Sequence, residues 1–176
     1  MVDFRNVSLR GRIAYGTMCV ESYALAHYPE RDWRPVLEVL WYLSKDVYWD
    51  DWPSRVVDIL PECVSHVIPY DSDDFETLDE RSYETLCNLY EDMPVAWATI
   101  MSDIVGMERE YAYTVIPGFG LASIAMLEEI VSLLEAEGIE VPDAMPIESL
   151  RFEGDGRGDP YDARPLSRIL KRLAQP

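Results

Sequence analysis

Residues 94–138, PVAWATIMSDIVGMEREYAYTVIPGFGLASIAMLEEIVSLLEAEG, decide the fold class of this chain. On both sides of the break at residues 117–120 (PGFG), apolar side chains recur every three or four residues, which is the spacing of an amphipathic helix. Gly138 then stands where a left-handed residue ends many helices. The stretch therefore predicts two consecutive helices, over about residues 94–115 and 121–137. Their apolar positions are Trp97, Ile100, Ile104, Met107, Tyr111, Val115, Ile124, Leu127, Val131 and Leu134.

The same reasoning predicts helices along the rest of the chain. Prolines at first-turn positions and apolar periodicity place them over residues 8–28, 34–47, 53–61, 77–91 and 166–173. In the first of these helices, the apolar side chains are expected to line one face. Residues 77–80 (TLDE) have the spacing of a capping box, with Thr77 as the expected cap.

Strand signals are few, and only residues 65–70 and 149–153 could form short extended segments. The prediction is an all-α single domain, residues 1–176, of six or seven helices around one core. Within it, residues 149–176 should form a Gly-rich loop and a short basic helix that packs on the rest.

Composition indicates a folded cytoplasmic protein. The 176 residues are 48% hydrophobic, which is enough for a real core despite a net charge of −18. No basic and apolar leader opens the sequence, and no apolar run is long enough to span a membrane. Cys19, Cys63 and Cys87 are expected to be free thiols in a reducing cytosol, because they are odd in number and far apart.

Nearly all of the negative charge lies in the middle of the chain. Residues 71–148 hold nineteen acids and two bases, whereas residues 1–70 hold ten and seven, and residues 149–176 hold four and six. Such a one-sided field attracts cationic partners and repels nucleic acid and anionic membranes. The arginines near the two termini could instead lie against these acids and neutralise part of them.

Acids and tryptophans supply the candidate binding residues. Residues 71–92 contain nine acids and one base, and three tryptophans stand beside acids earlier in the chain. Tryptophan is enriched at interface hot spots, so we expect the acids to steer a basic protein and the tryptophans to anchor it. The alternative to a binding role is that the acids form a solvated loop and helix start and that the tryptophan rings pack on the core. The predicted partner-binding residues are Asp71, Asp73, Asp74, Glu76, Asp79, Glu80, Trp33, Trp49, Asp50, Asp51 and Trp52; Trp41 and Trp97 are assigned to the core.

No catalytic, cofactor or metal site is predicted. The acidic segment lacks the glycine and the final glutamate of a calcium-binding loop, and neither HExxH nor GxSxG occurs. Glu137, Glu140 and Asp143 have three-residue spacing but straddle Gly138 and Pro142. The alternative function is nevertheless a metal-dependent all-α phosphohydrolase that acts on a small phosphorylated molecule. The third is a scaffold or a homo-oligomer subunit.

Several segments carry a family resemblance. Residues 9–16 (LRGRIAYG), residues 111–118 (YAYTVIPG) and the end of the chain from Phe152 to Ser167 resemble a group of small helical bacterial proteins of unassigned function. The small, acidic and aromatic-rich chain also resembles the immunity proteins of bacterial toxin systems. That resemblance implies a non-enzymatic protein that binds and neutralises a basic partner, a toxin, but it supplies no functional residue.

Overall fold

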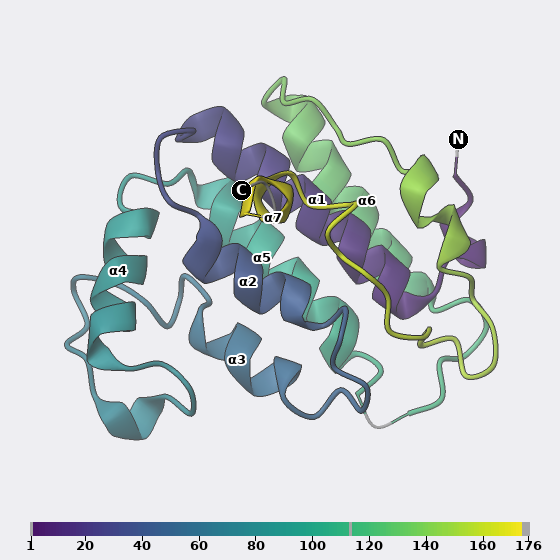
Figure 1. Ribbon diagram of the computed structural model, residues 1–176, viewed down its shortest axis with the longest axis horizontal. Helices are drawn as coiled ribbons and strands as arrows, with labels where there is room; N and C mark the ends of the chain where they lie inside the picture. Colours follow the sequence, from purple (N-terminus) through teal and green to yellow (C-terminus); the bar gives the residue numbers. More distant parts are fainter. Residues whose placement is uncertain (1, 113, 174–176) are drawn as a thin grey trace.

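The computed structural model describes residues 2–112 and 114–173, and over these residues the protein is all-α, as predicted (Figure 1). The helices are α1 (Leu9–His27), α2 (Arg34–Tyr42), α3 (Trp52–Asp58), α4 (Glu80–Tyr90), α5 (Val95–Arg109), α6 (Leu121–Ala136) and α7 (Arg168–Leu173). Three short 3-10 helices accompany them: η1 (Phe4–Asn6), η2 (Ser72–Asp74) and η3 (Met145–Ser149).

Helices α1, α5 and α6 pack against one another and form the centre of the molecule. Helix α2 covers α1, α3 joins α2 to α5, and α7 lies on α2. Helix α4 contacts α2 and lies at one end of the molecule (Figure 1). The acidic residues 71–92 therefore occupy an edge of the fold rather than its centre.

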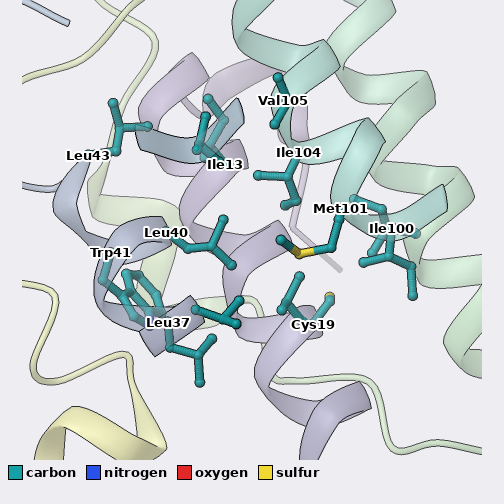
Figure 2. Close-up of a cluster of buried hydrophobic side chains, with 14 of the residues drawn as sticks. Ile13, Cys19, Leu37, Leu40, Trp41, Leu43, Ile100, Met101, Ile104 and Val105 are labelled. Atoms are coloured by element: carbon teal, nitrogen blue, oxygen red, sulfur yellow. The ribbon is translucent and has the colours of Figure 1, made fainter. Parts of the chain in front are cut away.

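The core is built where α1, α2 and α5 meet. Figure 2 shows side chains from all three helices directed toward one another, among them Ile13, Leu40 and Ile104. Trp41 and Trp97 are 3% and 1% exposed, which confirms their assignment to the core. Because these apolar side chains are almost completely removed from water, their burial is the main force that holds the helices together.

Helix α1 is buried on every face, which corrects the expectation of a single apolar face. All residues from Leu9 to Ala24 are buried, including the charged Arg10, Arg12 and Glu21. A Cβ atom on Gly16 would lie 2.4 Å from Ile104 Cδ1, so only glycine allows α5 to approach this closely. The apolar periodicity did not predict this, because a helix covered by neighbours on every side has no exposed polar face.

Helices α2 and α5 end well before their predicted ends, and in each case an arginine binds the backbone that follows. The chain leaves α2 at Tyr42, where the Arg10 guanidinium donates to the carbonyls of Leu43 and Asp46. It leaves α5 at Arg109, after which Arg157 donates to the carbonyls of Tyr111, Ala112 and Thr114. These bonds replace the helical ones, so Val47 and Val115, expected on buried faces, are exposed.

The predicted capping box is wrong. Asp79, rather than Thr77, caps α4 by accepting a hydrogen bond from the Ser82 amide at 2.8 Å. The Thr77 hydroxyl instead donates to Asp58 on α3 at 2.7 Å. Aspartate is as good a cap as threonine, and the tertiary contact with Asp58 decides between the two.

Of the two candidate extended segments, only the second forms any pairing within the described part of the chain. Arg151 makes an isolated antiparallel bridge with Val7. Beyond it, the C-terminal loop covers the start of α1, where the carbonyls of Gly156 and Arg157 accept from the amides of Leu9 and Arg10 at 2.9 and 3.0 Å. The loop thereby satisfies amides at the helix N-terminus that have no partner within the helix.

Candidate functional site

The acidic segment is exposed and lacks ionic partners among the residues that the structure describes. All six predicted acids between Asp71 and Glu80 are exposed, and the ion pairs found involve other residues. Asp71 and Asp79 also act locally, each accepting a backbone amide at the start of a helical turn. The hydrogen bond to Ser82 lowers the pKa of Asp79 below its usual value.

The terminal arginines do not neutralise this segment. Arg10 and Arg12 are 1% and 0% exposed and donate mainly to backbone carbonyls, while Arg5 and Arg164 pair with Asp3 and Asp162 two residues away. Lys171 and Arg172 were also expected to neutralise these acids, but their side chains lie outside the part of the chain that the structure describes. Among the described residues, no arginine forms an ion pair with an acid of residues 71–92.

Two of the three candidate tryptophan anchors belong to the core, and their prediction as partner-binding residues is wrong. Trp33 and Trp52 are 1% and 0% exposed, and their indole N–H groups donate to the carbonyls of Tyr28 and Leu40. Each ring fills space between helices, so a partner could reach neither without unfolding the helix ends around it. Sequence could not separate these rings from Trp49, because all three stand near acids.

Trp49 is partly exposed and is held in an unusual conformation. Its backbone is left-handed, with φ of 60°, which bulky residues rarely adopt. Asp46 fixes the loop by accepting the amides of Trp49, Asp51 and Trp52 at 3.1, 3.2 and 2.8 Å. The guanidinium carbons of Arg10 and Arg157 lie 4.8 and 5.6 Å from the centre of the ring, within the range of cation–π attraction.

The Trp49 loop and the acidic segment meet at one groove of about 780 Å³, which we call the acidic groove. Five acids and two arginines line it, together with apolar and aromatic side chains from α3, α5 and the Trp49 loop. Asp50, Asp74 and Glu76 are thus brought together from two separate predicted regions. Its lining residues are Tyr48, Trp49, Asp50, Pro53, Ser54, Val57, Asp58, Asp74, Glu76, Val105, Glu108, Arg109, Ala112 and Arg157.

Not every predicted acid faces the groove. Asp71, Asp73, Asp79 and Glu80 lie in or immediately before η2 and α4 and do not line the groove. Asp51 does not line it either and accepts a hydrogen bond from the Tyr42 hydroxyl at 3.0 Å. The predicted set therefore divides into groove residues and acids that contribute only to the field around it.

Two buried carboxylates in the groove have different surroundings. Asp58, 5% exposed, accepts from the amides of Glu76 and Thr77 at 3.4 and 2.6 Å and from the Thr77 hydroxyl, so it fastens the acidic segment to α3. Glu108, 4% exposed, receives no hydrogen bond and forms no ion pair with any described residue. Burial raises the pKa of Glu108, and the positive charges of Arg157 and Arg109 partly oppose that rise.

Sequence reasoning missed Tyr48, Glu108 and Arg157. Tyr48 is 80% exposed at the groove and is the most accessible aromatic side chain there. Its position in the run VYWDD was a usable signal, but the larger tryptophans drew the prediction. Glu108 carried no signal, because its importance depends on the groove that other segments build around it.

The remaining chemistry of the described residues is sparse. Among them, no three histidine, cysteine or acidic side chains converge as a metal ion would require. Cys19 and Cys87 are buried and Cys63 is half-buried, all three as free thiols, and burial raises the pKa of Cys19 to about 12. None of the helices described is both long and apolar enough to cross a membrane.

Comparison with known proteins gave no match: no family model, no curated protein and no solved structure is similar to this chain. The resemblance to immunity proteins therefore stays a prediction.

Proposed function

We propose that this protein is a non-enzymatic binding protein that neutralises a basic protein partner, as an immunity protein neutralises a bacterial toxin. The observation that carries the proposal is the acidic groove, where five acids and the exposed Tyr48 border one concave surface. A concave surface with an aromatic at its border and a negative field suits a partner rich in arginine and lysine.

The same field argues for a protein partner rather than nucleic acid or membrane, because phosphate groups would be repelled. Free thiols fit a reducing bacterial cytoplasm, and we place the protein there as part of the proposal. Steering by residues 71–80 would accelerate encounter at low salt and would fade as salt screens the charges.

Affinity capture from a bacterial lysate at low salt, and again at about 0.5 M salt, tests the proposal. The expected result is one basic protein, bound in stoichiometric amount, weakened by salt, and inhibited in its own activity when this protein is added. A captured protein that is acidic, or whose activity is unchanged, would contradict the proposal.

Charge reversal tests the steering role of the acidic segment. Changing Asp73, Asp74 and Glu76 to lysine should slow association with the captured partner at least tenfold at low salt, without unfolding the protein. The matched control changes Glu128, Glu135 and Glu140, which are exposed acids of α6 and of the turn after it, to lysine. Equal association rates for the two triple variants would show that total charge matters and that this segment does not.

A further inference from the structure

Glu108 is a buried carboxylate to which none of the described residues donates a hydrogen bond. Four fully enclosed side-chain atoms lack a hydrogen-bond partner among the described residues: Arg12 Nη2, Ser22 Oγ, Trp97 Nε1 and Asp103 Oδ2. The carboxylate oxygens of Glu108 do not belong to this group. With no described donor and a residue exposure of 4%, the small accessible area of Glu108 lies at its carboxylate, on the acidic groove that it lines. An ionised carboxylate that keeps only this small contact with water would be stabilised by a cation that donates hydrogen bonds to it.

The groove around Glu108 is suited to a cation that arrives from outside. The charges of Arg157 and Arg109 act on Glu108, but neither arginine forms an ion pair with it among the described residues, and Nη2 of Arg157 donates to the carbonyls that follow α5. Asp50, Asp74 and Glu76 add negative charge around the same opening. Five acids against two arginines leave the lining with a net charge of −3.

The chemistry of the groove favours arginine over lysine. A guanidinium is planar and weakly hydrated, and it can donate two parallel hydrogen bonds to one carboxylate. An ammonium group is strongly hydrated and would lose more on entering a nearly enclosed position. The volume of about 780 Å³ exceeds that of one side chain, so part of the partner's backbone could enter as well.

We propose that the acidic groove binds one arginine side chain of the protein partner, with the Glu108 carboxylate as its bidentate acceptor. The inference rests on the proposed function and deepens it, because it names the side chain that the groove recognises. The three acids at the opening would attract the arginine, and Glu108 would hold it.

A tripeptide titration tests this assignment without the partner. The probe is N-acetyl-Gly-Arg-Gly-amide at low salt, and the matched control probe replaces arginine with citrulline, which has nearly the same shape but no charge. The carboxyl ¹³C resonance of Glu108, followed by NMR in the wild-type protein, should move with the arginine peptide and stay in place with the citrulline peptide. No shift at the highest arginine-peptide concentration would overturn the proposal, whatever any variant does.

Two variants of equal charge sharpen the test. Glu108→Gln should weaken arginine-peptide binding about tenfold or more, because a charge-assisted bidentate pair is lost. Glu110→Gln removes the same charge two residues away, at an exposed position outside the groove lining, and should leave the affinity within about twofold. Equal weakening by both variants would overturn the assignment and leave only a general field effect.

The peptide and the captured partner separate the two proposals. Binding of a basic partner that is unaffected by Glu108→Gln would leave the proposed function standing and remove Glu108 from it. Peptide binding that depends on Glu108, together with capture of no basic protein, would keep the arginine site and overturn the proposed function.

Discussion

Helix α1 and the groove beside α5 each hold a carboxylate that is almost closed off from solvent, and the two carboxylates differ in how many hydrogen bonds they accept. Glu21 on α1 is 1% exposed and accepts hydrogen bonds from Trp41 Nε1, Ser167 Oγ and the Arg168 amide. Glu108 on α5 is 4% exposed and accepts none from the described residues. Burial raises the pKa of both carboxyls, but only Glu21 has hydrogen bonds that oppose the rise.

This difference separates a structural charge from a binding charge. A buried charge that is fully hydrogen-bonded fixes one arrangement of the chain, and Glu21 does so by tying the start of α7 to α1 and α2. A buried charge without donors destabilises the fold, which natural proteins tolerate mainly where a ligand supplies the missing partner. The comparison predicts opposite stability changes when the two kinds of charge are removed.

The largest expected effect comes from Arg10, a buried charge on α1 whose three guanidinium nitrogens all donate to backbone carbonyls. Arg10→Met should lower the free energy of unfolding by about 3 kcal/mol or more, because the carbonyls of Leu43, Asp46 and Gly158 lose a charged donor. Urea unfolding measures the change. Arg5→Met, at an exposed arginine paired with Asp3, should leave stability nearly unchanged. Similar losses for both would remove the distinction between structural and surface arginines.

Glu21→Gln should cost about 1–3 kcal/mol of unfolding free energy, because one amide oxygen cannot accept all three donors and the amide N–H₂ opposes them. Glu38→Gln, at an exposed position of α2, is the control and should be near neutral. Thermal and urea unfolding of the two variants provide the comparison. A Glu21 variant as stable as the Glu38 variant would mean that the carboxylate does not fasten α7.

Glu108→Gln should change stability in the opposite direction, raising the free energy of unfolding by on the order of 1 kcal/mol because no buried carboxylate remains to be dehydrated. Glu110→Gln is again the matched control, since it removes the same charge from an exposed site. A loss of stability in the Glu108 variant, measured by thermal unfolding, would show that the carboxylate has a donor in the free protein.

The last prediction concerns pH and a third carboxyl. Burial, followed by the nearby charge of Glu129, raises the pKa of Asp103 from 3.8 to about 6. The folded state binds the Asp103 proton more tightly than the unfolded state does, so protonation of this carboxyl stabilises the fold. This stabilisation is fully present below about pH 4 and is lost as pH rises through about 6. Asp103→Asn should therefore flatten the decline in stability between these values, as urea unfolding across pH would reveal. An unchanged pH profile would contradict the raised pKa.

Helix positions were predictable from the sequence where one side of a helix faces solvent. The apolar spacing in residues 121–137 led directly to α6, because periodicity records a boundary between core and water. It failed for α1, which has no solvent side, and it overran the ends of α2 and α5. At these two helix ends, the carbonyls are bound by arginines from distant segments of the chain, and no local sequence pattern predicts such contacts.

The candidate site was predictable only in part. Charge counting located the acidic edge, since the field depends on composition and on position along the chain. The choice among tryptophans failed for Trp33 and Trp52, because a ring beside acids can face the core or the surface with the same neighbours in sequence. Tyr48 and Glu108 acquired their importance from the groove around them.

The sequence by itself determined the all-α fold class, the positions of most helices and the uneven distribution of charge, because each depends on short-range spacing or on composition. Only the tertiary structure decided that Arg10, Arg12 and Glu21 are buried and bonded, while Glu108 is buried and accepts no hydrogen bond from the described residues. The physical reason is that the cost of burying a charge depends on donors and acceptors from distant parts of the chain, which only folding brings together.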